Sequence, residues 1–264
     1  MKTVLITGAS RGIGRAIGQL LWQQGYTVIG TSRQPTQAEA TPFELYPLDV
    51  SSDESVERCM GMVLSKYGRV DVLINNAGIA LYGAVEEATV EDVRRVMETN
   101  LLGVVRMTNA VLPHMRAARQ GQIINMSSLA GLVGVPYLGI YAASKHALEG
   151  YTTTLRYEVK HLGIHVTLIE PGDIGTDIER KQASRSYQEY KRGSESAVAI
   201  HEAHLQNGPP PEKVAAVAAE VIRSRRPHLR YTVTSGDEFW VPWMRRLLPD
   251  WVNERLIRSH FRLE

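Results

Sequence analysis

The chain contains little cysteine and almost no net charge, and it lacks long apolar runs. Its single cysteine, Cys59, can form no disulfide within the chain, and its place in a helical pattern indicates packing. The formal net charge is only +2, so the chain lacks the strong positive potential that would attract nucleic acid. No apolar run approaches the roughly 18 residues that cross a bilayer, and no basic-then-apolar leader precedes the first expected strand. We therefore expect a cytoplasmic protein that acts on small molecules.

What the sequence does contain is a regular alternation of short apolar runs with helical patterns. The 264 residues are 44% apolar, which is enough for a substantial core. Strands are expected at 4–6, 27–30, 44–48, 70–74, 123–126, 164–169 and 231–234, and helices at 13–25, 53–67, 89–116, 139–161 and 211–224. This order predicts an α/β protein: a single Rossmann-fold domain over residues 1–264, with a doubly wound parallel sheet of about seven strands and helices on both faces.

Two segments depart from this alternation. Residues 173–211 are weakly periodic and rich in charge, and segments of this kind in compact domains are often lids, so a substrate lid insertion is expected there. Within it, His201 and His204 do not form the H-E-x-x-H zinc pattern, so no metal is expected and they are interpreted as exposed lid residues. Residues 239–264 interleave tryptophan and leucine with arginine, which predicts an amphipathic C-terminal tail. Packing over a subunit interface or the substrate entrance is favoured for it over contact with a membrane surface.

A glycine-rich loop connects the first expected strand to the first helix. Gly8, Gly12 and Gly14 would let backbone N–H groups approach a pyrophosphate at the positive end of that helix. The spacing is G-x-x-x-G-x-G rather than the commoner G-x-G-x-x-G, but its strand-turn-helix setting favours nucleotide binding over a purely structural turn. Arg33 follows the second strand where NAD-preferring sites usually carry an acid, and with Arg11 it could hold a 2′-phosphate. NADP(H) is therefore expected in preference to NAD(H), the alternative being two surface arginines.

A tyrosine and a lysine four residues apart suggest acid–base chemistry. On a helix, Tyr141 and Lys145 share one face, and a neighbouring cation lowers the pKa of a phenol toward neutrality. Such a phenol can exchange a proton with an alcohol oxygen, and Ser128, if it comes from a neighbouring strand end, can hydrogen-bond the same oxygen. Tyr187 and Lys191 repeat the spacing without a serine at the matching upstream position, so the spacing alone is not specific.

Taken together, these motifs resemble the short-chain dehydrogenase/reductase family over about residues 2 to 235. The resemblance rests on Thr7 to Gly14, Asp49, Asn75 to Gly78, Asn100, Ser128, Tyr141 to Lys145, Pro171, Gly172 and Thr176. It implies a catalytic set of Asn100, Ser128, Tyr141 and Lys145, in which Lys145 also binds the nicotinamide ribose and Asn100 positions a relay water. The cofactor-binding residues are then expected to be Gly8, Ser10, Arg11, Gly12, Ile13, Gly14, Arg33, Asp49, Val50, Asn76, Ala77, Gly78, Tyr141, Lys145, Pro171, Gly172, Ile174 and Thr176.

Within that family, residues 144–150 and 155–158 look most like the hydroxysteroid and retinol dehydrogenases and related carbonyl reductases. The expected reaction is reduction of a hydrophobic ketone or aldehyde, or its reverse, against an apolar wall that includes Leu81, Tyr82, Val133 and Leu138. The alternative is a sensor that binds NADP(H) without turnover. The resemblance also suggests a homodimer or homotetramer that forms through the helices near 89–116 and 139–161.

Overall fold

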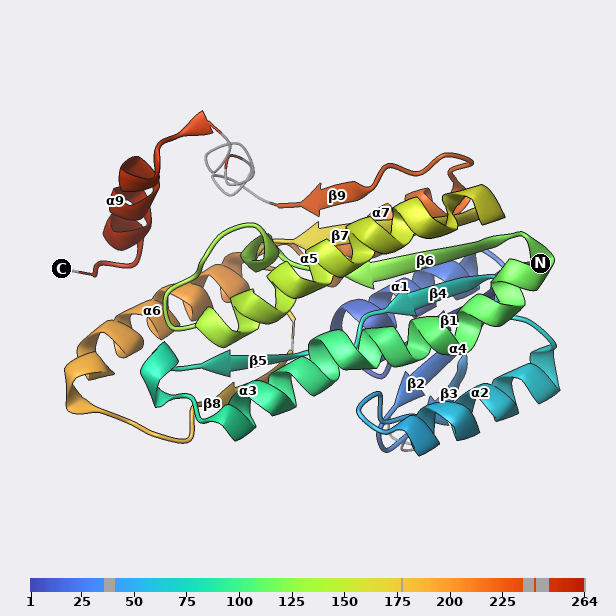
Figure 1. Cartoon of the computed structure of the whole chain (residues 1–264), viewed down its shortest axis with the longest axis horizontal. Coiled ribbons are helices and arrows are strands. Elements are labelled where there is room, and N and C mark those ends of the chain that lie inside the picture. The colour runs from blue at the N-terminus through green and yellow to red at the C-terminus, as the bar shows by residue number, and fades with distance from the viewer. Residues whose placement is uncertain (36–40, 177, 235–239, 241–246, 264) are drawn as a thin grey trace.

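Seven parallel strands form the central sheet of the computed structural model, which describes residues 1–35, 41–176, 178–234, 240 and 247–263 (Figure 1). The strands are β1 (Thr3–Ile6), β2 (Thr27–Ser32), β3 (Glu44–Pro47), β4 (Val72–Asn75), β6 (Gly121–Met126), β7 (Ile164–Pro171) and β9 (Arg230–Val233). Their order is β3-β2-β1-β4-β6-β7-β9, so the chain winds outward in both directions from β1 and β4. The structure confirms the predicted doubly wound sheet, whose binding crevice is expected at the carboxyl ends of β1 and β4.

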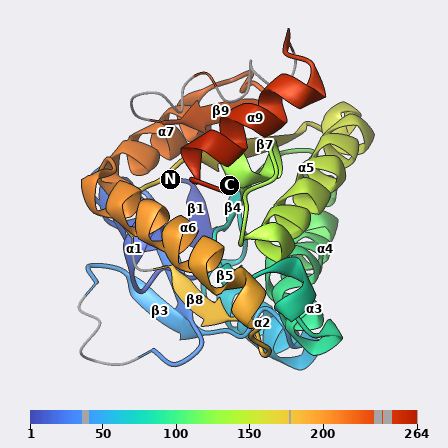
Figure 2. The same ribbon diagram turned by 90° about the vertical axis from the view of Figure 1, so that its left-hand side faces the viewer.

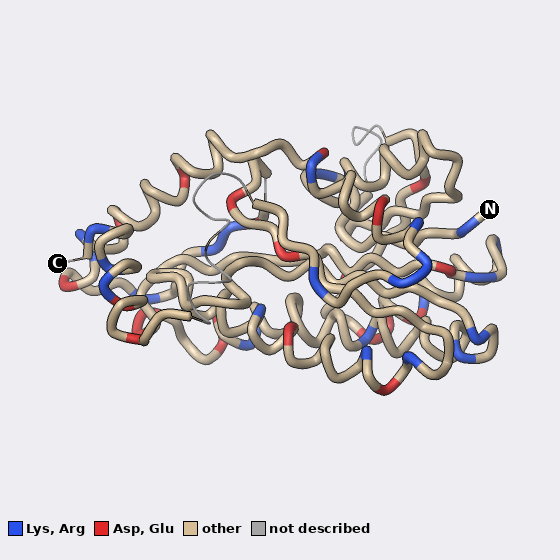
Figure 3. Tube along the Cα trace, turned by 90° about the horizontal axis from the view of Figure 1, so that it is seen from above, with Lys and Arg blue, Asp and Glu red and all other residues tan. Residues whose placement is uncertain are grey.

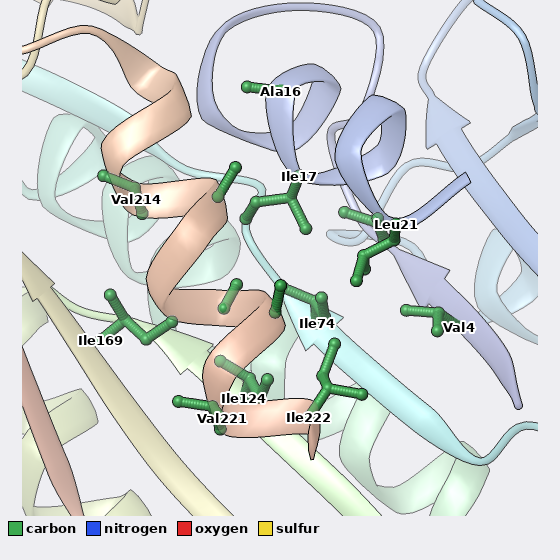
Figure 4. Packing of buried hydrophobic residues seen from close by; sticks show 14 of the residues in the cluster. Val4, Ala16, Ile17, Leu21, Ile74, Ile124, Ile169, Val214, Val221 and Ile222 are labelled. Atoms are coloured by element: carbon green, nitrogen blue, oxygen red, sulfur yellow. The ribbon is translucent and has the colours of Figure 1, made fainter. Parts of the chain in front are cut away.

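Helices cover both faces of this sheet. One face carries α1 (Gly12–Gln23) and α7 (Pro211–Arg223), and the other carries α2 (Asp53–Tyr67), α4 (Gly103–Ala118) and α5 (Gly139–Val159). Successive side chains of a strand point to opposite faces, so Ile74 packs against α1 and α7 while its neighbour Leu73 packs against the other layer. Figure 4 shows Val214, Val221 and Ile222 of α7 directed at the strand residues. Each Å² of apolar surface that the two helix layers bury stabilises the fold by roughly 25 cal/mol. This packing holds the strand ends that carry the site in place.

The expected helix at 89–116 is interrupted by a π turn. Thr89 begins α3 (Val90–Met97) with a capping box: its hydroxyl accepts from the Asp92 N–H at 3.2 Å, and the Asp92 carboxylate accepts from the Thr89 N–H at 3.0 Å. A π-helical turn over Glu98–Leu102 follows before α4 begins. Such turns insert one residue into the helical register and are frequent at functional sites. Here the turn contains Asn100, which is 1% exposed.

A second layer of structure lies beyond the carboxyl ends of the sheet strands. It contains a parallel pair of short strands, β5 (Ile79–Tyr82) and β8 (Glu179–Gln182), and the helices α6 (Gln188–Asn207) and α9 (Asp250–His260). Figure 2 shows α6 and α9 in front of the strand ends. Single 3-10 turns occur at Val85–Glu87, Leu129–Gly131 and Lys160–Leu162. The expected lid region thus contains β8 and α6, neither of which the weak periodicity of the segment had indicated.

The low net charge and the single cysteine of the sequence correspond to a surface of mixed charge and a buried thiol. Lys and Arg are interspersed with Asp and Glu over most of the trace (Figure 3). Cys59 is fully buried against the core, and burial raises the pKa of its thiol to about 11, which confirms a packing role. No helix among the described residues is both long enough and apolar enough to cross a membrane.

Candidate active site

A cavity of about 1760 Å³ opens at the carboxyl ends of the sheet strands. Pockets for a single small ligand typically measure roughly 300–1,000 Å³, so this one has room for a dinucleotide and a second molecule. It is lined by 21 of the residues named from the sequence: Gly8, Ser10, Arg11, Gly12, Ile13, Arg33, Asp49, Val50, Asn76, Ala77, Gly78, Tyr82, Ser128, Val133, Leu138, Tyr141, Lys145, Pro171, Gly172, Ile174 and Thr176. Three others, Gly14, Leu81 and Asn100, do not line it.

The glycine loop has the backbone shape that a pyrophosphate site requires. Gly8 and Gly12 have φ angles of 67° and 53°, in the left-handed region that glycine tolerates best. Arg11 stands at the N-cap of α1, where no side chain of the described chain supplies a capping hydrogen bond and the first turn contains no acid. The first N–H groups of α1 therefore face the cavity with the positive end of the helix dipole, which fits an anionic phosphate.

Gly14 supports this loop from behind rather than lining the cavity. A Cβ at this position would lie 2.3 Å from the Gly8 carbonyl oxygen and 2.5 Å from Asn76 Nδ2, so only glycine fits. Asn76 Nδ2 donates to the carbonyl oxygens of Thr7 and Gly8, each at 3.0 Å. The Asn-Asn-Ala-Gly segment thereby clamps the glycine loop in place, and the close approach of Gly14 permits that clamp.

The expected ribose and adenine end of the cavity contains both arginines and Asp49. The Asp49 carboxylate accepts hydrogen bonds from the Ser51 N–H at 2.9 Å and the Ser51 hydroxyl at 2.6 Å, which fixes its orientation. Arg11 and Arg33 both line the cavity. The Arg33 guanidinium forms an ion pair with Glu179 of β8. A 2′-phosphate would have to exchange with that carboxylate, and these residues are consistent with a dinucleotide that carries one.

The proposed acid–base groups lie at the opposite end of the cavity. Lys145 Nζ donates to the Met126 carbonyl oxygen at 2.8 Å and lies 5.6 Å from the centroid of the Tyr141 ring. Burial lowers the pKa of Lys145 to about 8, against the opposing effect of the Glu149 carboxylate. Burial raises the pKa of Tyr141 to about 12, against a hydrogen bond with Ser128 that lowers it.

This result corrects the expectation that Lys145 lowers the pKa of the phenol. The ammonium is directed at a backbone carbonyl, so in this structure desolvation dominates the titration of Tyr141. Tyr141 is consequently a neutral phenol at physiological pH, which is the form that can donate a proton. The nearby Ser128 hydroxyl can contact the same substrate oxygen.

The side-chain amide of Asn100 forms its hydrogen bonds with other residues of the protein. Its Nδ2 donates to the Ile79 carbonyl oxygen at 2.9 Å and to the Ser144 hydroxyl at 3.0 Å, while its Oδ1 accepts from the Ile79 N–H at 2.9 Å. The side chain therefore joins β5 to α5 directly behind the site. A Cβ on Gly78 would lie 3.3 Å from Asn100 Oδ1 and 3.8 Å from Lys145 Nζ, so these residues are close neighbours. The relay role of Asn100 stays a prediction.

The expected substrate wall is formed by Tyr82, Val133 and Leu138 but not by Leu81. Tyr82 packs in one cluster with Leu138, whereas Leu81 packs with Val96 of α3 in another. The side chains of consecutive strand residues point to opposite faces of the strand. Leu81 and Tyr82 of β5 therefore cannot both face the substrate. The sequence had not predicted β5, and this is the reason for the difference.

The lid and the tail contribute cavity residues that the sequence reasoning did not include. His201 and His204 were interpreted as exposed, but both line the cavity and each contacts Asp173. Their spacing of three along a helix was a usable signal, because such residues share one face. Ile257 of α9 and Phe261, the C-cap residue that follows this helix, also line the cavity, and the Ser196 hydroxyl donates to the Phe261 carbonyl oxygen at 3.3 Å. The described part of the tail therefore contributes residues to the cavity lining, while residues 239, 241–246 and 264 of the expected tail lie outside the described residues. Its packing over the entrance stays a prediction.

Comparison with known proteins yields relatives over most of the chain. Residues 2–186 match the family described as short chain dehydrogenase. The 3-ketodihydrosphingosine reductase of Bacteroides thetaiotaomicron is 40% identical over 236 residues, which cover 88% of this chain and 87% of that protein. A short-chain dehydrogenase structure from Streptomyces avermitilis is 32% identical with a TM-score of 0.85, covering 97% of this chain and 94% of that one. The structure of ElxO with NADP bound is 30% identical with a TM-score of 0.73, covering 89% and 96% respectively.

The matched region contains the glycine loop, the sheet from β1 to β7 and the Ser128, Tyr141 and Lys145 group. Both the family match and the relatives extend well beyond the dinucleotide-binding half of the sheet, so they include the groups that would carry the chemistry. The chain belongs to the short-chain dehydrogenase/reductase family of NAD(P)-dependent oxidoreductases.

Proposed function

We propose that this protein is an NADP(H)-dependent oxidoreductase that interconverts hydrophobic ketones or aldehydes with their alcohols. One observation carries the proposal: a single cavity joins a phosphate-binding loop to a half-buried serine, a half-buried tyrosine and a buried lysine. A dinucleotide on the loop can extend toward Tyr141, and the remaining volume beyond Tyr141 is bounded by Val133, Leu138 and the elements that cover the mouth. This is the arrangement that a two-substrate hydride transfer requires.

In the reductive direction, each side chain has a defined task. Bound NADPH supplies the hydride that reduces the carbonyl carbon. Ser128 donates a hydrogen bond to the carbonyl oxygen and fixes its position, and the neutral Tyr141 phenol gives its proton to that oxygen as negative charge develops there. The Lys145 ammonium lies next to the phenolate that remains and stabilises it electrostatically. Oxidation of the alcohol uses the same groups in reverse.

The preference for NADP(H) is supported by the two arginines at the cavity. Arg11 and Arg33 are the residues that a 2′-phosphate would meet, and planar guanidinium groups bind phosphate well. The ElxO neighbour has NADP bound. Glu179 is the competing partner of Arg33, so binding of the phosphate would replace one ion pair with another.

The choice of a hydrophobic carbonyl compound is supported by the wall beyond Tyr141. Val133, Leu138 and Ile257 supply apolar surface there, and burial of each substrate methylene against such surface contributes about 0.8 kcal/mol. The relative from Bacteroides thetaiotaomicron is named for the reduction of a keto compound, 3-ketodihydrosphingosine.

The test is NADPH consumption with a panel of long-chain ketones and aldehydes, measured for the wild type, Tyr141→Phe and Tyr187→Phe. Tyr187 is the matched control because it repeats the Tyr-x-x-x-Lys spacing but does not line the cavity. We expect Tyr141→Phe to lower kcat by about 10²–10⁴-fold, the usual contribution of a positioned acid, and Tyr187→Phe to retain activity. Tight NADPH binding without turnover of any carbonyl or alcohol would instead support the sensor.

A further inference from the structure

Three polar side chains outside the proposed catalytic group meet on the cavity wall. Tyr82 lies at the end of β5, Asp173 follows β7, and His201 lies on α6. The rings of Tyr82 and His201 are 5.7 Å apart between centroids. His201 Nδ1 lies 3.1 Å from Asp173 Oδ1. Since three separate elements place these groups together, they form a localised polar site.

The hydroxyl of Tyr82 is the strongest indication that a ligand belongs there. Tyr82 is 3% exposed, and its hydroxyl has no hydrogen-bond partner within the part of the chain that the structure describes. A buried polar group left without a partner costs about 1–3 kcal/mol, so such groups are normally satisfied. Tyr82 lines the cavity and shares an apolar cluster with Tyr141. A molecule in the cavity is therefore the natural partner for its hydroxyl.

Asp173 gives the site its charge. Its two carboxylate oxygens are 3.1 Å from Nδ1 of His201 and 3.1 Å from Nδ1 of His204. Burial alone would raise the pKa of Asp173, but these contacts lower it below its ordinary value, so the carboxylate is ionised at neutral pH. Each oxygen has two lone pairs and can accept a further hydrogen bond. Its charge also acts on Tyr141, whose pKa it helps to raise after the larger effect of burial, so the carboxylate lies near the reacting group.

The geometry does not suit a metal ion. Each histidine directs its Nδ1 at a different oxygen of Asp173 at hydrogen-bond distance, rather than at a shared centre. No set of three potential ligands among the described residues is arranged to hold an ion. The groups that line the cavity here are thus a phenol, a carboxylate and an imidazole.

We propose that Tyr82, Asp173 and His201 form a substrate subsite for a hydrogen-bond-donating substituent, a hydroxyl or a protonated amine, carried close to the carbonyl group. The proposal rests on the function proposed above and defines its substrate class further: an apolar chain with a donor group near the carbonyl. The substituent donates to the Asp173 carboxylate and meets the Tyr82 hydroxyl. A carboxylate at the same place on the substrate is repelled by Asp173.

The experiment compares four ketones of equal chain length with NADPH: a plain ketone, its α-amino derivative, its α-hydroxy derivative and the corresponding 3-oxo acid. For the wild type we expect kcat/KM to be at least tenfold higher for the amino or hydroxy ketone than for the plain ketone, and lowest for the oxo acid. The two donor-bearing compounds distinguish a charged from a neutral substituent. Reduction of the plain ketone without any preference for donor-bearing compounds overturns the subsite but leaves the proposed function intact. If none of the four is reduced, the proposed function itself fails.

Two variants, Asp173→Asn and Tyr82→Phe, test whether the preference for donor-bearing ketones depends on this subsite. Hydrogen bonds to charged groups contribute about 1.5–3 kcal/mol, so Asp173→Asn should lower kcat/KM for the amino ketone at least tenfold more than for the plain ketone. Tyr82→Phe removes an atom that has no partner to lose within the described chain, so folding is preserved and the same selective loss should appear, at a few-fold. Glu54→Gln and Tyr187→Phe are matched controls, because neither residue lines the cavity, and they should not change the ratio. An equal loss for all four ketones in both variants would show a purely structural role and overturn the subsite.

Discussion

The pKa values of the two groups proposed for acid–base chemistry shift in opposite directions because desolvation is the largest effect on both. Desolvation disfavours the charged form of each, which raises the pKa of the Tyr141 phenol to about 12 and lowers that of the Lys145 ammonium to about 8. The phenol therefore keeps its proton throughout the neutral range. Lys145, in contrast, is balanced between its two forms slightly above neutrality. The pH dependence of the reaction should come from the lysine.

The first prediction concerns that dependence. Lys145 is charged below its pKa of about 8 and neutral above it, so the electrostatic support that it gives to a Tyr141 phenolate is lost as pH rises. We expect kcat/KM for ketone reduction, which at saturating NADPH reports groups of the enzyme–NADPH complex, to fall above about pH 8. The measurement is a pH profile of initial rates for the wild type and Lys145→Arg. The descending limb should move to higher pH in the arginine variant, and a limb that stays in place would assign it to another group.

The second prediction concerns Arg33. Removing a guanidinium that binds phosphate should cost about 1.5–3 kcal/mol, so Arg33→Ala should raise KM for NADPH by about ten- to hundredfold and leave KM for NADH nearly unchanged. Arg58→Ala is the matched control, because Arg58 pairs with Glu54 on the outer face of α2 and does not line the cavity. Steady-state kinetics with both cofactors provide the comparison. An equal change for NADPH and NADH would remove Arg33 from the recognition of the 2′-phosphate.

At the scale of single elements, the glycine loop and the π turn show how local structure places the site. The loop lies between β1 and α1, and Gly14 brings the first turn of α1 against Asn76. The π turn places Asn100 where it bonds both the Ile79 backbone and Ser144. Each element thus holds one end of the cavity.

The third prediction uses two glycines in helices. A Cβ at Gly14 would collide with the Gly8 carbonyl oxygen and Asn76 Nδ2, so Gly14→Ala should displace the loop, lower Tm and weaken NADPH binding at least tenfold. At Gly61 in α2, no atom lies within 4 Å of the position that a Cβ would take, and Gly61→Ala should stabilise the fold by up to about 1 kcal/mol. Thermal unfolding and NADPH titration test both variants. Normal NADPH affinity in Gly14→Ala would contradict the clamping role.

Sequence patterns predicted those strands and helices that are marked by neighbouring residues in the chain, such as an apolar run or a helix cap. Val4 to Ile6 is a continuous apolar run, and Thr89 has the cap residues of a helix start, so their assignments needed no tertiary information. The short strands β5 and β8 were not predicted, because each is four residues long and is held by pairing with the other rather than by its own pattern. The π turn was also missed, since the apolar spacing on either side of it is that of an ordinary helix.

The same distinction applies to the site. The residues of the glycine loop and the Tyr141 group are set by motifs, and the structure gathers them in one cavity. Asp173 and His201 come together only when α6 folds back across the strand ends, which no spacing in the sequence encodes. The direction of the Tyr141 pKa likewise depended on burial and on the hydrogen bond of Lys145 to Met126, both of which are tertiary facts.

At the scale of the whole molecule, the sheet supplies the cofactor end of the cavity and the segments beyond it supply the substrate end. β1, β4 and β7 each end at the cavity, and α6 and α9, which lie in front of the strand ends in Figure 2, contribute further residues to its lining. Specificity for the carbonyl compound should therefore respond to changes in the covering helices without loss of cofactor binding.

The expected homodimer or homotetramer through the helices near 89–116 and 139–161 stays a prediction.

The fourth prediction tests that separation. Ile257 lines the mouth from α9, so Ile257→Gln should lower kcat/KM for a long-chain ketone by roughly three- to tenfold, as expected for loss of about 1 kcal/mol of apolar contact. KM for NADPH should not change. Trp251→Gln is the control on the same helix, because Trp251 is 68% exposed and does not line this cavity. If both variants behave alike toward the ketone, α9 does not form part of the substrate wall.

The proposed function requires that a hydride passes from NADPH to a carbonyl carbon within this cavity. The most direct measurement is mass spectrometry of the product formed from an apolar ketone with NADPH deuterated at C4 of the nicotinamide, using each of the two C4 diastereomers. We expect an alcohol with one deuterium on the carbinol carbon from one diastereomer and an unlabelled alcohol from the other. Formation of no alcohol while NADPH binds tightly, or of an unlabelled alcohol from both diastereomers, would contradict it.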